Sequence, residues 1–282
     1  MRQATLHDVT RTIEALGAQG MRALVAPLPH PRRTASAVSA EKRRFFAVLA
    51  VLRERGLSAD LSLKPSQLGG GRLWSDCLSA AEEIAALCRY HNAFLWLDME
   101  QPATADLTLA LFQELSSRWP NVGICLQACL RRTARDLDMV LQREAPVRLV
   151  KGFFRARDGE SYPTWRQTTD NFIRLLPGLL ARSRRPAIGT HDPLVIHAAK
   201  RALALAPARK LAGTGEEEPP QPLEFQFFHG VKEKLQRRLV QEGWPVRVYL
   251  PYGPFLPWLG HTLPILDWRR AAQRLLGRGE IR

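Results

Sequence analysis

The chain has 282 residues, with 41 Lys and Arg against 27 Asp and Glu, which gives a formal net charge of +14. Hydrophobic residues make up 45% and charged residues 24%. This composition excludes a disordered basic tail and fits a folded protein of one large or two small domains. The positive charge raises nucleic acid, anionic membranes and phosphorylated ligands as partners without choosing among them.

The four cysteines give the first indication of where the protein works. They form no CxxC pair and no metal-ligand spacing, so we expect buried free thiols in a reducing cytosol. The polar start of the chain carries no secretory h-region, and no uninterrupted apolar stretch approaches the length of a membrane span. These features predict a cytoplasmic protein, with peripheral contact at a membrane surface left open. The cysteines are Cys77, Cys88, Cys125 and Cys129.

Eight short apolar runs recur along the chain and predict eight strands. Most are apolar on both alternating faces, which is typical of strands buried in a parallel sheet. The runs span residues 21–28, 59–65, 93–99, 122–128, 147–153, 186–191, 223–228 and 246–251.

Helical patterns separate these runs and end at glycine, before proline or in polar turns. Eight strands alternating with helices predict a distorted (β/α)8 TIM-like barrel, and we expect residues 1–282 to form a single domain. A doubly wound open sheet is the alternative, although neither a GxGxxG nor a GxxxxGK[ST] motif is in place. The segment 213–222, rich in Pro and Glu, predicts an exposed connection. The predicted helices span 40–56, 75–92, 104–120, 133–144, 164–183, 194–206 and 232–243.

Polar side chains follow almost every predicted strand. One such residue would be an ordinary solvent contact, but the carboxyl ends of barrel strands meet at one face, where chemistry takes place. Lys64 and Asp98 end neighbouring strands, so we expect them to pair as counterions in one pocket. No HExxH motif or second histidine at a ligand spacing occurs, so no metal is predicted. The strand-end residues are Lys64, Asp98, Gln127, Lys151, Thr190, His191, Gln226 and Tyr249.

Taken together, the strand motifs resemble those of proline dehydrogenases. The chain contains LSLKPSQLG, LWLDME, LQACLRRT, VRLVKGFF, IGTHDPLV, EFQFFHGV and VRVYLPYG in the order seen in that family. The resemblance runs from about residue 15 to 253. It implies FAD bound in a distorted (β/α)8 barrel, oxidation of L-proline to Δ1-pyrroline-5-carboxylate, and transfer of the electrons to a quinone.

The resemblance also implies roles for the residues closest to the chemistry. Lys64 would face the substrate carboxylate, with Asp98 beside it. Tyr249 would pack against the substrate ring. Arg148 would reach the flavin N5 edge, where a hydride arrives and a cation stabilises the reduced ring.

Further matching positions are implied to bind FAD through backbone, amine or ring contacts. Thr190 and His191 would hold the diphosphate or ribityl region. Gln226 and Phe228 would lie near the adenine end. The full set of these positions is Gln127, Ala128, Val150, Lys151, Gly152, Thr190, His191, Gln226 and Phe228.

Two departures from the family pattern bear on the substrate. The family's Thr-His-Asn is Thr-His-Asp here, which places Asp192 near a phosphate-bearing cofactor. The family's Arg-Arg pair, which clamps the substrate carboxylate, is replaced by His261 and Thr262, and two guanidiniums give bidentate recognition that these residues cannot replace.

These departures leave several interpretations. We expect a flavin-dependent oxidoreductase with weak or no activity on L-proline, acting on it or on a related cyclic or secondary amine, such as a modified or carrier-bound proline. A non-catalytic or regulatory barrel is the alternative. No motif supports nucleic-acid binding, so none is expected.

Overall fold

Eight parallel strands close into a barrel in the computed structural model, which describes residues 5–28, 34–152, 154, 156–207, 209–210, 217–218 and 221–253. Around the ring the order is β1-β10-β9-β6-β5-β4-β3-β2, and every neighbouring pair is parallel. The predicted (β/α)8 barrel is therefore confirmed and the open sheet was wrong. The strands are β1 (Arg22–Pro27), β2 (Ala59–Leu63), β3 (Leu95–Leu97), β4 (Val122–Gln127), β5 (Val147–Val150), β6 (Pro186–Gly189), β9 (Glu224–Phe228) and β10 (Val246–Tyr252).

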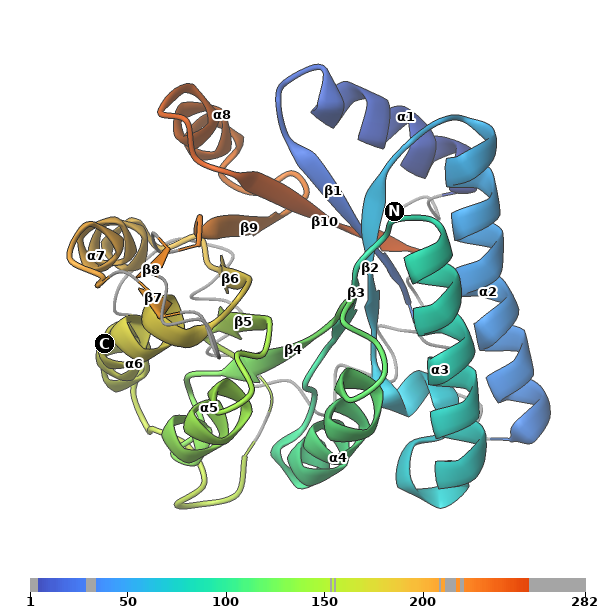
Figure 1. The fold of residues 1–282 in the computed structure, drawn as a ribbon, viewed down its shortest axis with the longest axis horizontal. Helices are drawn as coiled ribbons and strands as arrows, with labels where there is room; N and C mark the ends of the chain where they lie inside the picture. Colours follow the sequence, from blue (N-terminus) through green and yellow to red (C-terminus); the bar gives the residue numbers. More distant parts are fainter. Residues whose placement is uncertain are drawn as a thin grey trace.

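Helices connect the strands on the outside of the barrel (Figure 1). Each of the seven predicted helices is present, with boundaries shifted by a few residues. The helices are α1 (Leu6–Gly17), α2 (Ala35–Glu54), α3 (Trp74–Tyr90), α4 (Ala105–Ser116), α5 (Thr133–Leu141), α6 (Trp165–Arg182), α7 (Pro193–Ala204) and α8 (Glu233–Gln241), with 3₁₀ turns η1 (Pro65–Leu68), η2 (Gly70–Leu73) and η3 (Pro102–Thr104).

Helix α1 was not predicted, and it precedes the first strand. Thr5 and Asp8 form a capping box at its start, with the Asp8 amide donating to Thr5 Oγ1 at 3.2 Å and the Thr5 amide to Asp8 Oδ2 at 2.9 Å. Val9, Ile13 and Leu16 lie on one face and are buried, and the helix packs on β1 and β10. The Thr-x-x-Asp spacing before this apolar stripe was the missed signal.

The segment 213–222 is not a plain connection. It contributes to a short antiparallel hairpin of β7 (Arg209–Lys210) and β8 (Glu217–Glu218), in which Arg209 pairs with Glu218 and Lys210 with Glu217. The predicted connection therefore contains one short strand, Glu217–Glu218.

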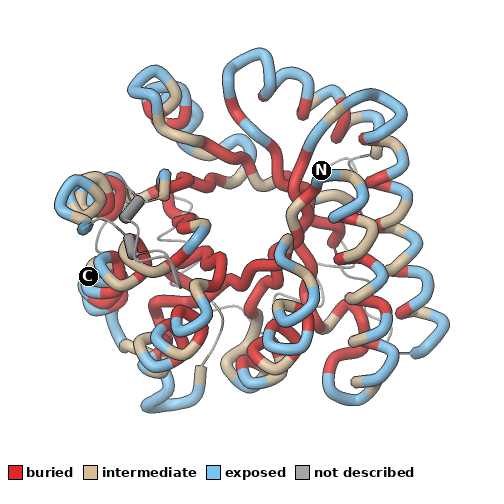
Figure 2. The backbone as a smooth tube through the Cα atoms, in the orientation of Figure 1, coloured by how far each residue is buried: buried red, intermediate tan, exposed pale blue. Residues whose placement is uncertain are grey.

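Buried residues follow the ring of strands and the helix faces turned toward it (Figure 2). They belong to two kinds of interior. Between strands and helices lies a continuous apolar core, which contains three of the free, buried cysteines, as expected for thiols in this chain. Inside the ring of strands the apolar group is small, with Leu24, Trp96 and Ala187 at its centre. The rest of that interior contains buried charged and amide side chains, and these build the site described below.

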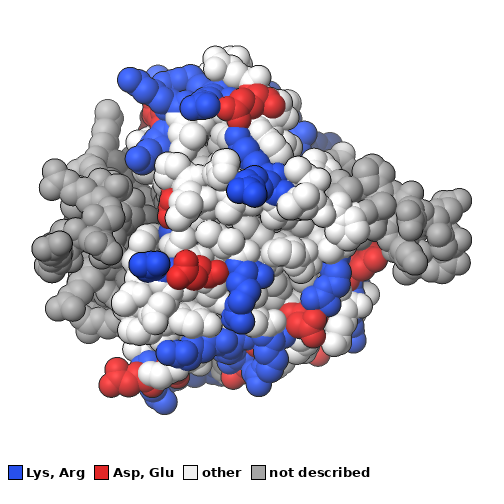
Figure 3. All heavy atoms as spheres, turned by 90° about the vertical axis from the view of Figure 1, so that its left-hand side faces the viewer, with Lys and Arg blue, Asp and Glu red and all other residues white. Residues whose placement is uncertain are grey.

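The charges on the outside of the molecule are spread over the helices. Figure 3 shows one face, on which Lys and Arg side chains lie in separate groups with uncharged atoms between them. Several of these cations sit beside carboxylates, as the ion pair of Arg237 with Glu233 on α8 illustrates. No helix in the described ranges is both long and apolar enough to cross a membrane.

Gly123 in β4 tests how tightly the barrel interior is packed. A Cβ at this position would lie 2.8 Å from the Trp96 ring and 2.9 Å from the Phe94 ring. We expect Gly123→Ala to lower the free energy of unfolding by about 1–3 kcal/mol, because both rings are held inside the ring of strands. Urea denaturation measures the change. Gly71→Ala is the control, since its Cβ would meet only Leu107 at 3.8 Å, and an equal loss in both variants would contradict the interpretation.

Candidate active site

Asp98 is the centre of the buried charge cluster at the carboxyl ends of the strands. It directly follows β3 and accepts a hydrogen bond from Lys64 Nζ on Oδ2 at 2.9 Å. Tyr249 OH donates to the same oxygen at 2.9 Å, and Lys64 Nζ also donates to Tyr249 OH at 2.9 Å. Arg148 Nη2 donates to the other oxygen, Oδ1. The predicted Lys64–Asp98 pair is thus confirmed, and it is part of a cluster of four side chains.

The ionisation of this cluster follows from its burial and its charges. Burial alone would raise the pKa of Asp98, but Lys64 and Arg148 outweigh it and lower the pKa to about 2. Burial alone would lower the pKa of Lys64, but Asp98 and Tyr249 raise it above the ordinary lysine value. Burial raises the pKa of Tyr249. At neutral pH the cluster therefore holds two cations, one carboxylate and a neutral phenol.

Arg148 is held from a second side by Gln226. Its Nη1 donates to Gln226 Oε1 at 3.1 Å, while Gln226 Nε2 donates to Glu224 Oε1 at 2.7 Å. The resemblance implies that Gln226 lies near the adenine end of the cofactor. The structure adds a hydrogen bond between Gln226 and Arg148, because β5 and β9 flank β6 and both side chains point into the barrel.

Lys151 belongs to a separate cluster just beyond β5. Its Nζ donates to Asp192 Oδ2 at 2.5 Å and to Thr169 Oγ1 at 2.6 Å, and it lies 4.1 Å from the centre of the Trp165 ring. Burial lowers the pKa of Lys151, and Asp192 offsets this only in part. The unusual Asp192 thus has a partner in this chain, which explains how an added carboxylate is tolerated at this place.

His191 and Phe228 form the aromatic part of the site. The Phe228 amide donates to His191 Nε2 at 3.0 Å, and the two rings are stacked with centres 5.7 Å apart. Phe228 also meets Tyr249 edge to face at 5.2 Å, so this pair adjoins the Asp98 cluster. Thr190 precedes His191, and its Oγ1 accepts from the Asp192 amide at 3.1 Å.

The remaining predicted residues lie at the ends of β4 and β5. Gln127 donates through Nε2 to the Glu100 carbonyl at 2.7 Å, and the Ala128 amide donates to the Val150 carbonyl at 2.7 Å. Gly152 has φ +85°, and a Cβ there would lie 2.6 Å from both Cys129 Sγ and Gln127 Oε1. Only glycine therefore fits this turn.

His261 was expected to bind substrate, and it lies outside the described residues. Conversely, the sequence reasoning missed four buried or half-buried charged residues at or near the starts of strands. They extend the polar interior below Arg148. The signal was a charged residue inside or beside an apolar run, which had been sought only at strand ends. These residues are Asp60, Arg185, Glu224 and Arg247.

A closed (β/α)8 barrel with a buried, charged site at the carboxyl ends of its strands defines a TIM-barrel enzyme. The family model described as proline dehydrogenase matches residues 2–263, nearly the whole chain. The chain therefore belongs to the proline dehydrogenase family, and it is an oxidoreductase of the class that acts on CH–NH groups.

Similar proteins with the same family name support the assignment. Proline dehydrogenase 2 of Bacillus subtilis (strain 168) is 27% identical over 263 residues, which cover 93% of this chain and 81% of the relative. Proline dehydrogenase of Deinococcus radiodurans is 32% identical over 203 residues, 70% of this chain and 62% of the relative. The barrel is also similar to proline utilization A from Bdellovibrio bacteriovorus, with a TM-score of 0.75 and 20% identity. That match covers 92% of this chain but 31% of the larger protein.

Replacing Asp98 tests the cluster as a structural unit. Asp98→Asn leaves Lys64 and Arg148 buried without a counter-charge, so we expect a loss of about 3–5 kcal/mol in the free energy of unfolding. Asp106→Asn is the matched control, because that carboxylate pairs with Arg132 but is exposed, and its loss should stay below about 1 kcal/mol. Urea denaturation of both variants decides the point, and similar losses would contradict it.

The pH dependence of stability provides a second test. Asp98 has a pKa of about 2 in the folded chain and about 3.9 when unfolded, so its contribution is complete above the unfolded value. That contribution is lost as pH falls from about 4 to 2. We therefore expect the stability difference between the wild type and Asp98→Asn to shrink over this range. A difference that stays constant down to pH 2 would show that another group carries the effect.

Proposed function

We propose that this chain is an FAD-dependent oxidoreductase that oxidises L-proline or a related cyclic or secondary amine. The reaction would remove a hydride from the carbon next to nitrogen and leave an imine such as Δ1-pyrroline-5-carboxylate. The observation that carries the proposal is the Asp98 cluster, which holds two fixed cations around one carboxylate at the face where barrel enzymes do their chemistry.

The residues present fit a flavin. Arg148 Nε is buried and has no hydrogen-bond partner among the described residues, so an uncommitted donor lies in the site. A flavin ring offers acceptor atoms for such a donor, and a buried unpaired donor is costly unless a ligand satisfies it. A bound flavin would supply the oxidising power by accepting the hydride. Lys151, Gly152, Thr190 and His191 are the residues we propose to hold the rest of FAD.

The charge of the cluster favours an anionic group on the substrate. Lys64 and Arg148 together carry one more charge than Asp98 neutralises, and both are buried. A buried excess cation attracts a carboxylate far more strongly than an exposed one does. We propose that Lys64 binds the substrate carboxylate, that Asp98 fixes Lys64, and that Tyr249 packs against the substrate ring. Because Lys64 stays protonated at neutral pH, it would orient the substrate and would not remove its proton.

The replaced arginine pair is compatible with this proposal and with its alternative. His261 and Thr262 stand where the family has two arginines, so we propose weaker use of L-proline and better use of an amine whose carboxylate is modified or tethered. A non-catalytic or regulatory barrel is the second candidate, because the same replacement would also follow if catalysis had been lost.

Partners and location follow from the proposed reaction. A quinone or another external acceptor would take the electrons from the reduced cofactor. We propose that residues 1–282 act as a single cytoplasmic domain, with contact at a membrane surface only where such an acceptor requires it. No nucleic-acid partner is proposed.

Absorption spectroscopy tests the proposed reaction directly. We expect the purified or FAD-loaded protein to be yellow, and to bleach when titrated without oxygen with L-proline or with N-substituted and carboxyl-modified prolines. Protein that cannot be loaded with FAD would overturn the proposal. Loaded protein whose colour no amine bleaches would favour the non-catalytic barrel.

Arg148 is the residue whose replacement should affect the reaction most. Arg148→Ala should slow reduction of bound flavin by about 10²-fold or more, because a fixed cation next to developing negative charge is removed. Stopped-flow measurement of flavin reduction gives the rate. Arg237→Ala on α8 is the control, since that guanidinium is half-exposed and distant from the strand ends. Equal rates in the Arg148 variant and the wild type would refute its role.

A further inference from the structure

A hollow of about 820 Å3 opens at the amino-terminal mouth of the barrel, the end opposite the candidate active site. Its walls come from strand starts and from the loops that precede them, including Arg22 in β1, Asp60 in β2 and Arg247 in β10. The end of α1 closes one side with Ile13 and Glu14. Nothing in the proposed reaction uses this cavity.

The carboxylates in this cavity are already neutralised. Asp60 is bound by two guanidiniums, with Arg185 Nη2 at 2.7 Å from Oδ2 and Arg247 Nη1 at 3.3 Å from Oδ1. Arg247 also donates to the buried Glu224 at 2.8 Å. Glu14 on the rim lies 3.9 Å from Arg55. Each acidic side chain of the cavity therefore already lies beside at least one cation.

The guanidiniums of the cavity, in contrast, are only partly paired with carboxylates. Arg22 and Arg89 line the cavity from exposed positions, and within the described part of the chain neither forms an ion pair. Arg185 commits only Nη2 to carboxylates, while its Nε and Nη1 have no acceptor among the described side chains and backbone. Positive charge thus gathers around a concave surface, where it attracts anions more strongly than on a flat face.

Arg185 is the most fixed of these groups. Its guanidinium stacks on the Phe94 ring at 4.1 Å from the ring centre and lies 5.4 Å from the centre of the Trp96 ring. The bond to Asp60 sets its rotation in the plane of this stack. A guanidinium ordered before binding loses little freedom when it takes a ligand.

We propose that this cavity binds a compact anion with two or more negative charges, carried by phosphate or carboxylate groups. Arg185 is the fixed anchor, and Arg22 and Arg89 approach the ligand from the rim. The planar fork of a guanidinium matches both phosphate and carboxylate oxygens. The number of negative charges on the ligand, more than the kind of acid group, therefore decides binding.

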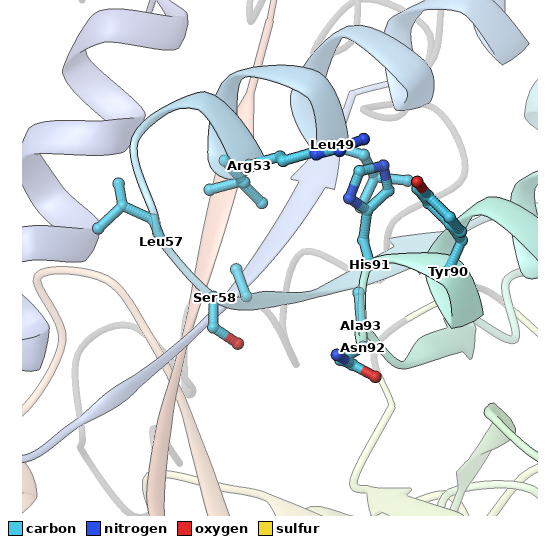
Figure 4. Close-up of a pocket in the computed structure, with 10 residues that line it drawn as sticks. Leu49, Arg53, Leu57, Ser58, Tyr90, His91, Asn92 and Ala93 are labelled. Carbon is cyan, nitrogen blue, oxygen red and sulfur yellow. The ribbon is translucent and has the colours of Figure 1, made fainter.

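The cavity has room for more than an inorganic ion. A second hollow of about 400 Å3 adjoins it and shares Leu57, Ser58, Asn92 and Ala93 with it (Figure 4). Tyr90 is exposed on its edge with Arg53 5.5 Å above the ring centre. The uncharged part of a larger ligand would lie in this hollow, beside an aromatic surface.

Isothermal titration calorimetry with pyrophosphate and with citrate tests the site. We expect at least one probe to bind saturably with one site per chain at moderate salt. The double variant Arg22→Ala/Arg89→Ala should bind it at least about tenfold more weakly, as the loss of charge-assisted hydrogen bonds implies. Whether pyrophosphate or citrate binds better shows which acid group the site prefers.

The control removes the same charge elsewhere. Arg201→Ala/Arg237→Ala takes two cations from the outer helices α7 and α8, and its affinity should stay within about twofold of the wild type. Unchanged melting temperatures show that both double variants are folded, and they are expected because all four side chains are exposed. No saturable binding of either probe would overturn the proposal. Equal weakening in the two double variants would also overturn it, because it would reduce the effect to general charge attraction.

Discussion

One buried carboxylate, that of Asp98, holds the upper interior of this barrel together. Lys64 reaches it from the end of β2 and Arg148 from β5, on opposite sides of β3. Tyr249 donates a hydrogen bond to one of its oxygens. Two like charges so close together inside a protein would repel each other and lose hydration, so their placement depends on the negative charge between them. The roles proposed for Lys64 and Arg148 depend on this arrangement. Lys64 stays charged, Arg148 stays oriented, and the excess of one cation is left for a substrate carboxylate.

Buried charges also need partners below Arg148, where the inside of the barrel is lined by further cations and carboxylates that bind one another. Gln226 links Arg148 to Glu224, Arg247 links Glu224 to Asp60, and Arg185 completes the chain at the opposite mouth. Hydrogen bonds, together with one ion pair of 3.3 Å between Arg247 and Asp60, therefore connect described residues from one end of the barrel to the other. An apolar filling would stabilise such a barrel at lower cost. The polar filling fixes Arg148 from two directions, so its position depends on residues far from the reaction.

The sequence predicted most of the fold and part of the site, and the reasons differ. Buried parallel strands are apolar on both faces, so all eight were visible, and strand ends converge by topology, so Lys64 and Asp98 could be paired in advance. Helix α1 was missed because a Thr-Asp capping box is a short signal beside a polar terminus. The contact of Gln226 with Arg148 could not be foreseen, because it depends on which strands become neighbours and on which side chains point inward. The pairing of Asp192 with Lys151 needed the same knowledge.

The net charge of +14 has two physical meanings in this chain. On the outer helices, cations such as Arg237 are half-exposed, lie beside carboxylates and are screened by salt, so they say little about a ligand. Inside the barrel the same charge is buried, and around the hollow at its amino-terminal mouth it lines a concave surface. Lys64 and Arg148 exceed their carboxylate at one end, and Arg22, Arg89 and Arg185 exceed theirs at the other. The position of an arginine or lysine relative to the barrel therefore decides whether it indicates a ligand site. The net charge of the chain alone does not indicate one.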